Sequence, residues 1–441
     1  MRKIAILGTG PLPIERDSYI YSSSNRTWHV AKGLLDSGHR VHVIAFRPTR
    51  VERGQRKLDP EHRTFEDGAF TLDSVEEMIH FRNDAFLRAR LEGFGPDLLI
   101  GVNAFPAARA AALVPSIPFW ADMNGFGMGE VQVRARLTGR DEAIPHGWGD
   151  ELPALVHADV FSAASGPQRY ALVGELAAIG RLRASTCGYE FVHVIPNGRE
   201  DPPPSTDSPP LRSDLPEDAI VALWIGCYNY QFDTENLFKG LSIAMEKDPR
   251  IHFVSTGGQV DGHNEITFSA FRTQVDSSPH RDRCHFLGWL DWLDFDALMR
   301  ASDLGVSMDV PCYETEFGAR NRLTEMMRVG LPAITTEGPE IARELVESDA
   351  GWVVPARSPE AFADALLAAA ASPELRARKG ANGRRLFLSR YTLSASLAPL
   401  LRWAENPWTA PDKGSQPLLL QAKTRDEGRG ILGKLRRLTK G

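Results

Sequence analysis

The chain has 441 residues, of which 42% are hydrophobic and 24% charged, a balance that excludes a disordered or fibrous protein. At about 150 residues per domain, this length predicts two or three domains. The net charge of −6 argues against nucleic acid as a partner. Four scattered cysteines without a C-x-x-C pair argue against disulfides and zinc, and no apolar run is long enough for a membrane span. The sequence also starts without a secretory signal, so we expect a soluble cytoplasmic protein.

In the first half of the chain, short β-branched segments alternate with longer amphipathic ones. The expected strands cover residues 3–7, 40–46, 98–102, 118–121, 160–163 and 193–195, and the expected first helix covers residues 26–37. Strands separated by helical lengths predict a parallel sheet with helices on both faces. We therefore interpret residues 1–198 as a doubly wound α/β domain.

A proline-rich segment divides the chain at residues 199–217, where six prolines exclude a helix or a central strand and predict a hinge. The alternation then resumes. Strands are expected at residues 220–225, 251–255, 284–287, 304–308 and 333–335, and helices at residues 234–246, 294–301, 322–329 and 359–371. This pattern predicts a second α/β domain over residues 218–385. A C-terminal helix over residues 386–410 is expected to pack back on the first domain.

The end of the chain, residues 411–441, differs in composition from the rest. Residues 421–441 carry seven basic side chains against two acidic ones. If this segment is helical, Ile431, Leu435 and Leu438 share one face, as in a helix that lies on an anionic membrane surface. The alternative is a disordered, solvated tail.

Residues 309–332 (D-V-P-C-Y-E-T-E-F-G-A-R-N-R-L-T-E-M-M-R-V-G-L-P) run from an apolar strand through a loop into a helix. The start of such a helix offers free N–H groups and a positive dipole end to an anion. Arg320 and Arg322 place positive charges at the start of the helix, where the helix dipole alone would favour acidic residues. A bound diphosphate would explain these two cations. Glu325 follows Arg322 by one turn, where it could accept hydrogen bonds from ribose hydroxyls; the alternative is an ordinary surface pair. Gly318 allows close approach of the backbone to a ligand.

Several segments together resemble a known family. N-R-L-T-E-M-M-R-V-G-L-P (residues 321–332) is similar to the N-K-L-x-E-x-x-x-x-G-x-P signature of GT-B retaining glycosyltransferases of the family-4 type, the glycosyl transferases group 1. Further similar segments are W-H-V-A-K-G-L-L-D-S-G-H-R-V-H-V-I (28–44), V-I-P-N-G (194–198), F-L-G-W-L (286–290), A-I-T-T-E-G-P-E-I (333–341) and G-W-V-V-P (351–355). The resemblance covers residues 1–405. It implies the GT-B architecture: two Rossmann-like domains that face a cleft, with the donor in the second domain and the acceptor in the first.

The resemblance also implies an activity. The expected enzyme is a hexosyltransferase-like protein that moves a sugar from a nucleotide-diphosphate sugar to a sugar, lipid-linked or small-molecule acceptor. Retention of configuration would follow a front-face mechanism in which the leaving diphosphate helps deprotonate the acceptor. Neither a cofactor nor a metal is expected.

Donor-site roles follow from the resemblance, residue by residue. Arg322 would contact the diphosphate, with Arg320 and Asn321 beside it, and Glu325 would bind the ribose. Glu316, or alternatively Glu314, would be the glutamate beside the donor sugar. The backbone amides of Gly318 and Ala319 would face the sugar or its phosphate.

Two departures from the family pattern matter. In the family, seven residues lie between the two glutamates, and the corresponding position before Glu325 is Phe317. The usual G-R-x-x-x-K-G is replaced by W-I-G-C-Y-N-Y-Q-F-D (224–233), which lacks a basic residue, so Tyr228 and Asn229 become candidate donor contacts. The tyrosines could equally be hinge packing. These departures keep two alternatives open: a nucleotide-sugar epimerase of the same fold, and a catalytically silent protein that binds nucleotide sugars.

Candidates for the acceptor side follow expected strand ends in the first domain. Gly10 lies in the turn G-T-G-P-L-P (8–13), which lacks the third glycine of a dinucleotide fingerprint. Arg26 lies near the start of the first helix. In W-A-D-M-N-G (120–125), Asp122 is the candidate for the residue that faces the sugar, with Asn124 assisting; a capping aspartate is the alternative. Asn103 is a weaker candidate.

The acidic and histidine residues show no metal-site spacing. Asp294 and Asp296 have the D-x-D spacing of metal-dependent transferases, but they stand at an expected helix start, where capping is the simpler role. The histidines show neither H-x-H nor i, i+4 spacing. No catalytic metal is therefore predicted.

Overall fold

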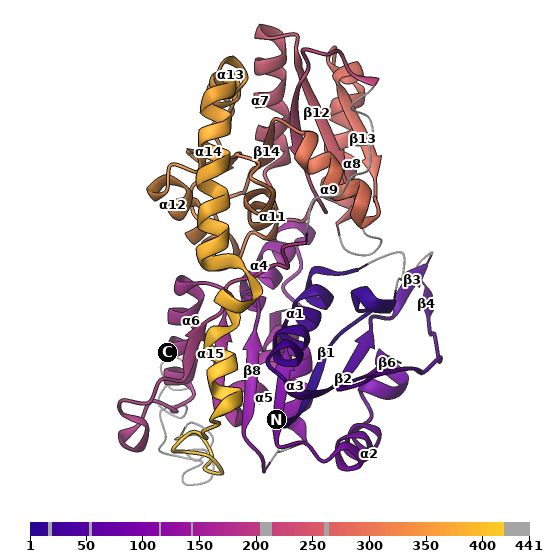
Figure 1. Ribbon diagram of the computed structural model, residues 1–441, viewed down its shortest axis with the longest axis vertical. Helices are drawn as coiled ribbons and strands as arrows, with labels where there is room; N and C mark the ends of the chain where they lie inside the picture. Colours follow the sequence, from indigo (N-terminus) through magenta and orange to yellow (C-terminus); the bar gives the residue numbers. More distant parts are fainter. Residues whose placement is uncertain are drawn as a thin grey trace, which may run out of the picture.

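The protein consists of two lobes, each built around one sheet (Figure 1). The computed structural model describes residues 1–15, 20–52, 55–113, 116–142, 144–202, 214–259 and 264–418. The strands of the first sheet are, in spatial order, β10 (Val192–Val194), β9 (Val160–Ala163), β8 (Phe119–Met123), β7 (Leu98–Val102), β1 (Lys3–Thr9), β2 (Arg40–Arg47), β6 (Phe70–Glu76) and β5 (Arg63–Asp67). All neighbours are parallel except β5, which pairs antiparallel with β6. Beside this sheet, β3 (Arg50–Glu52) and β4 (Gln55–Lys57) form an antiparallel pair.

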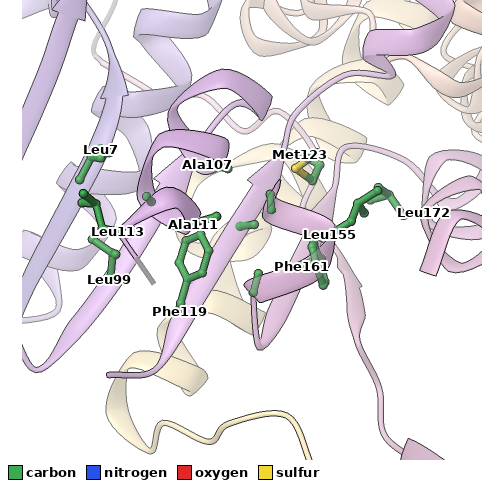
Figure 2. Packing of buried hydrophobic residues seen from close by; sticks show 14 of the residues in the cluster. Leu7, Leu99, Ala107, Ala111, Leu113, Phe119, Met123, Leu155, Phe161 and Leu172 are labelled. Carbon is green, nitrogen blue, oxygen red and sulfur yellow. The ribbon is translucent and has the colours of Figure 1, made fainter. Parts of the chain in front are cut away.

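The strands of the first sheet are buried on both faces, because alternate apolar side chains point to opposite sides. Ile4 and Ile6 of β1 pack with α1 (Ser22–Asp36) and α15 (Leu393–Glu405). Ala5 and Leu7 belong to the opposite core, which Figure 2 shows between the sheet and its other helices. The helices of that face are α2 (Asp84–Phe94), α3 (Ala104–Ala112), α5 (Ile144–His157) and α6 (Gly166–Ala178).

The remaining elements of the first lobe are short or lie at its edge. They are η1 (Pro13–Glu15), η2 (Glu77–Phe81), α4 (Gly127–Thr138) and η3 (Ala184–Thr186). Of these, α4 packs against α5 and reaches the second lobe.

The second sheet is parallel throughout, and helices cover both of its faces. Its strands are, in spatial order, β13 (Cys284–Gly288), β12 (Ile251–Thr256), β11 (Ile220–Trp224), β14 (Leu304–Ser307), β15 (Ala333–Thr336) and β16 (Gly351–Val354). One face packs on α7 (Thr234–Lys247), α8 (Glu265–Asp276) and α13 (Pro359–Ala371). The other packs on α9 (Trp292–Ala301), α11 (Asn321–Val329), α12 (Glu340–Glu347) and η6 (Phe387–Tyr391). The remaining elements are η5 (Arg281–Arg283), α10 (Tyr313–Phe317) and α14 (Pro373–Leu386).

The predicted fold class, two doubly wound α/β domains, is confirmed. The strand pair β5–β6 was not predicted, because polar residues interrupt the apolar pattern of β6. Its Asp73 is buried and accepts hydrogen bonds at 2.8 Å from His42 and 2.7 Å from His62. These hydrogen bonds allow the polar Asp73 to be buried in the core. The two histidines lie 31 and 11 residues away in the sequence, so a local pattern does not predict the pairing.

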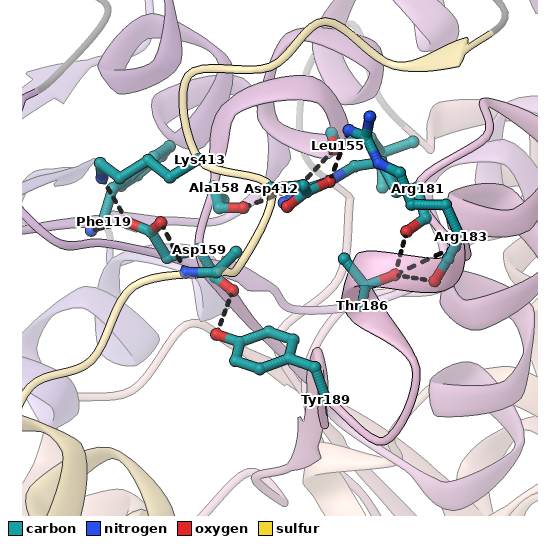
Figure 3. A network of polar contacts seen from close by, with 11 residues as sticks. Phe119, Leu155, Ala158, Asp159, Arg181, Arg183, Thr186, Tyr189, Asp412 and Lys413 are labelled. Atoms are coloured by element: carbon teal, nitrogen blue, oxygen red, sulfur yellow. Dashed lines mark hydrogen bonds and ion pairs between the residues drawn. The ribbon is translucent and has the colours of Figure 1, made fainter.

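A C-terminal strap, residues 406–413, follows α15 and contacts Ile117 and Asp159, which lie just before β8 and β9 (Figure 3). Asp412 accepts two hydrogen bonds from Arg181, at 2.8 and 3.0 Å, and one from Arg183. Lys413 forms an ion pair with Asp159. The carboxylates of Asp412 and Asp159 are almost fully buried. The strap is therefore bound to the first domain by buried ion pairs.

We expect Asp412→Ala to lower the free energy of unfolding by about 3–5 kcal/mol, because it leaves the buried Arg181 guanidinium without a counter-charge. Urea unfolding followed by circular dichroism measures the change. Asp36→Ala is the matched control, since it removes an exposed i,i+4 pair with Lys32 and should cost only ~0.5 kcal/mol. Equal losses in the two variants would contradict the role of the strap.

Candidate functional site

The candidate site lies where the chain order reverses in the second sheet. From β11 the chain continues to β12 and β13 on one side, whereas β14, β15 and β16 lie on the other. In open parallel sheets, ligands bind outside the carboxyl ends of the strands at such a switch point. The loops after β11 and β14 meet there: Phe232 and Asp309 form a bridge, and the Val310 amide donates to the Gln231 carbonyl at 2.8 Å.

Arg322 reaches this switch point from the first turn of α11. Its guanidinium lies 3.9 Å from the ring centroid of Trp224 and 3.8 Å from that of Phe232. Nη2 donates to the Cys227 carbonyl at 2.8 Å, while Nη1 is buried and has no hydrogen-bond partner in the part of the chain that is described. Burial lowers the pKa of Arg322 to about 10, although the nearby Asp309 raises it. An unpaired buried donor costs ~1–3 kcal/mol, so an anion at Nη1 would be stabilised.

Arg320, the second predicted cation, is already paired. It forms ion pairs at 2.8 Å with Asp309 and at 2.9 Å with Glu314, and all three side chains are buried. Burial acts to lower the pKa of Arg320, but the two carboxylates raise it above its ordinary value. The prediction that Arg320 contacts a diphosphate directly does not fit this geometry, because two buried carboxylates already bind its guanidinium.

The two candidate glutamates for the sugar side lie in different surroundings. Glu314 is buried against Arg320, whereas Glu316 on the same short helix, α10, is exposed. Gly318 follows, and a Cβ there would come within 2.6 Å of the Glu314 carbonyl and of its Oε1. Glycine is therefore needed at this position to accommodate Glu314, and the half-buried Ala319 continues the loop toward α11.

Tyr228 and Asn229 differ in their burial and in their hydrogen-bond partners. Tyr228 is fully buried, stacks on Trp224 at 4.6 Å and hydrogen-bonds through its hydroxyl to Ser255 at 2.7 Å. Burial raises the pKa of this phenol far above its ordinary value. Tyr228 is thus a core residue of the second domain and not a donor contact. Asn229 is half-buried, and its Oδ1 is a buried acceptor without a partner among the described residues.

Glu325 is held at the boundary between the domains. Its Oε1 accepts from Arg199 Nε at 2.6 Å, and its Oε2 accepts from Arg328 Nε at 2.8 Å. Beside this pair, Asn197 donates to the side chain of Asn321 at 2.7 Å. The end of the first domain therefore binds the first two turns of α11, the helix that carries Arg322.

In the first domain, Arg26 and Asp122 bind each other. The guanidinium donates to both carboxylate oxygens, at 2.9 and 2.7 Å, and also to the carbonyls of Ile195 and Pro196 at 3.0 Å. Ser162 donates to Asp122 as well. Both charged side chains are almost fully buried. The predictions that Asp122 faces the sugar and that Arg26 reaches the cleft do not fit this arrangement, because the pair is saturated and joins α1 to β8.

The other acceptor-side candidates gather at the switch point of the first sheet, between β1 and β7. Asn103 donates to Thr9 Oγ1 at 3.3 Å and accepts from Asn124 at 3.2 Å. The Gly10 amide donates to the Phe46 carbonyl at 2.7 Å, and a Cβ there would come within 3.3 Å of that oxygen. The structure thus brings Gly10, Asn103 and Asn124 together at the carboxyl ends of the strands of the first sheet.

The predicted absence of a metal site was argued from spacing alone. Among the described residues, no three His, Cys, Asp or Glu side chains are grouped in a way that could hold a metal ion. Sequence reasoning missed Arg199 and Arg328, because Arg199 simply follows the V-I-P-N-G segment and its partner is 126 residues away. No local signal marks such a pair.

Comparisons with known proteins agree with this geometry. The sequence model of the family described as Glycosyl transferases group 1 matches residues 221–372, which run from β11 to the end of α13 and contain the switch point. No curated protein matches the chain in sequence. The confirmed resemblance therefore rests on this family match and on the fold.

Several solved structures share the fold. Sucrose-phosphate synthase from Thermosynechococcus elongatus has a TM-score of 0.67 at 18% identity, over 92% of this chain and 98% of that one. Anabaena HepE in complex with UDP-glucose has a TM-score of 0.62 at 14% identity, over 92% and 100%. Trehalose-6-phosphate synthase OtsA has a TM-score of 0.68 at 13% identity, over 92% and 100%. The chain has the GT-B fold, and its second domain matches the group 1 glycosyl transferases.

We expect the Arg199–Glu325 pair to show a coupling energy of ~0.5–3 kcal/mol, since its side chains are only 10% and 14% exposed. A double-mutant cycle with Arg199→Ala and Glu325→Ala, followed by urea unfolding, measures it. The exposed pair Arg272–Asp276 is the matched control and should couple much more weakly. Additive losses at Arg199 and Glu325 would show that the contact does not join the domains.

Proposed function

We propose that this chain is a glycosyltransferase that moves a sugar from a nucleotide-diphosphate sugar to an acceptor hydroxyl. One observation carries the proposal: the buried, unpartnered Nη1 of Arg322 at the switch point of the second sheet, within the residues that match the group 1 family. A diphosphate would supply the oxygens that this donor lacks. The UDP-glucose in the HepE structure supports a uridine nucleotide as the first donor to test.

The chemistry gives Arg322 a catalytic role. As the bond between the sugar C1 and the diphosphate oxygen breaks, negative charge grows on the departing diphosphate. A guanidinium fixed between Trp224 and Phe232 stabilises that charge without reorganising. Because Arg322 supplies the positive charge, we extend the proposal to metal-independent transfer.

We propose retention of configuration through attack on the face that the diphosphate leaves. The acceptor oxygen bonds to C1, the bond from C1 to the diphosphate breaks, and the acceptor proton passes to the departing phosphate oxygen. The products are a glycoside and a nucleoside diphosphate. The transferred group is proposed to be a hexose, and the product a glycan, glycolipid or glycosylated metabolite.

The nucleoside and sugar contacts are proposed from the family resemblance and the geometry together. Glu325 would receive the ribose hydroxyls through lone pairs that its two arginines leave free, with Asn321 beside it. Asn229 Oδ1 offers a buried acceptor without a partner among the described residues. The exposed Glu316 and the backbone of Gly318 and Ala319 would face the sugar.

We expect at least one of UDP, GDP, ADP and dTDP to raise the Tm of the protein, because a ligand that binds only the folded state stabilises it. Arg322→Ala should weaken that binding about 10- to 100-fold, the value of a charge-assisted hydrogen bond. Arg378→Ala is the matched control, since this arginine is exposed on α14 and pairs with Asp349. No shift with any nucleotide would contradict the proposal.

Release of the nucleoside diphosphate from the matching nucleotide sugar separates the alternatives. Turnover that depends on Arg322 supports a transferase. Binding without turnover of any donor would favour the catalytically silent protein, for which the ion pairs that Glu325 and Arg320 already form within the protein are the specific argument. Conversion of the sugar without an acceptor would favour the epimerase.

We also propose a cytoplasmic location, with peripheral membrane contact through residues 421–441, which lie outside the described residues. No helix in the described part of the chain combines the length and apolar character that a bilayer span needs. The full chain should sediment with phosphatidylglycerol vesicles and not with phosphatidylcholine vesicles, because the segment is basic. Removal of residues 421–441 should abolish this sedimentation; unchanged sedimentation would rule the contact out.

A further inference from the structure

Helix α4 is one of the parts of the first domain that contact the candidate donor site, and Figure 1 shows it at the junction of the two lobes. A Cβ at Gly129 would come within 3.0 Å of the Glu314 backbone nitrogen. The rings of Phe126 and Phe317 meet edge to face at 5.0 Å. The start of α4 is therefore in contact with α10, the short helix that carries both candidate sugar-side glutamates.

Glu130 lies in the first turn of α4. Its carboxylate differs from the nearby carboxylates of Glu314 and Glu151 in its hydrogen-bond partners. Glu314 is paired with Arg320, and Glu151 accepts from the Met128 backbone. Among the residues that the structure describes, none donates a hydrogen bond to Glu130, although solvent reaches its side chain. Its Oε1 lies where a Cβ at Gly125 would be 3.2 Å away, directly after β8. The exposed carboxylate of Glu130 thus lies beside the contact between α4 and α10, and it has no donor among the described residues.

Charged groups of both domains surround Glu130. The protein packed around the carboxylate of Glu130 is the largest cause that raises its pKa above the ordinary value, although the side chain is exposed; the carboxylates of Glu314 and Glu151 raise it further, while Arg320 acts in the opposite direction. Arg134 lies one turn further along α4. It is close enough to Tyr230, in the loop after β11, to lower the pKa of that phenol against the larger raising effect of burial. One side of α4 therefore extends from the Glu314–Arg320 pair to the loop beside Arg322.

We propose that Glu130 is an acceptor-binding residue: its carboxylate accepts a hydrogen bond from a hydroxyl of a sugar acceptor and positions that acceptor against the donor. The inference rests on the proposed function, which supplies the donor on the opposite wall. A carboxylate without a protein donor is suited to a hydroxyl-rich ligand and repels an anionic group at the same place. The acceptor proton still leaves with the diphosphate, so Glu130 binds and orients without acting as the base.

The experiment uses the full chain, UDP-glucose as donor, and D-glucose, D-galactose, D-mannose and D-fructose as acceptors, with UDP release as the readout. Glu130→Gln and Glu130→Ala should raise the acceptor KM about 10- to 100-fold. The UDP-induced rise in Tm and the slow hydrolysis of UDP-glucose without acceptor should not change. Glu92→Gln is the matched control, because Glu92 is exposed on α2, away from the junction in Figure 1.

The pH dependence gives a second readout that a purely structural role would not move. The ionised carboxylate is the stronger acceptor, so the acceptor KM of the wild type should be lowest where Glu130 is ionised and should rise as the pH falls through its raised pKa. Glu130→Gln should remove this dependence. If Glu130 only stabilises the start of α4, both variants lower Tm slightly and leave KM and its pH profile unchanged, which overturns the inference.

The outcomes separate the two proposals. A wild type that binds UDP and hydrolyses UDP-glucose but uses none of the four hexoses overturns the sugar acceptor at Glu130 and leaves the transferase standing. An acceptor KM that is unchanged in both variants does the same. A wild type that neither binds nor hydrolyses any nucleotide sugar overturns the proposed function itself.

Discussion

The relative position of the two domains depends on Arg199. At this residue, the segment that leaves the first domain meets the segment that returns to it from the second domain. Its amide donates to the Tyr391 carbonyl at 2.8 Å, so the outgoing segment pairs with the segment that returns from the second domain. Its side chain binds Glu325 on the helix that carries Arg322. One residue thus joins both crossings to the candidate donor site. Any rotation of one domain against the other must change the surroundings of Glu325.

Buried arginines lie in both domains near the candidate site, and they differ in their partners. Arg26 binds Asp122, and Arg320 binds Asp309 and Glu314. These cations have carboxylate partners, so their charges are already compensated within the fold. Arg322 instead lies between two aromatic rings and keeps one buried N–H without a partner in the described residues. This difference between a paired and an unpaired guanidinium is the reason why we propose Arg322, and not Arg320, as the anion-binding residue.

The fold class was predicted correctly, and the proposed donor-site residues could be picked out, because both depend on local patterns in the sequence. Strand and helix periods are visible in short windows, and Arg322 and Glu325 lie within one helix that begins after a strand end. Burial and pairing are not local. Tyr228 could not be assigned to the core before its contact with Ser255 was known, and the Arg26–Asp122 pair spans 96 residues. From residue type alone, Tyr228, Arg26 and Asp122 were all interpreted as substrate-binding residues.

The same reasoning explains why more candidates could be named in the second domain than in the first. The proposed donor site is built from two short loops and one helix, and most of its residues lie in one stretch of sequence. The proposed acceptor site combines the ends of separate strands with α4, which reaches Glu314 only because the two domains are in contact. Glu130 acquires its surroundings from both domains at once. A residue whose chemistry arises at a domain junction has no signature in its own neighbours, and only the folded chain reveals it.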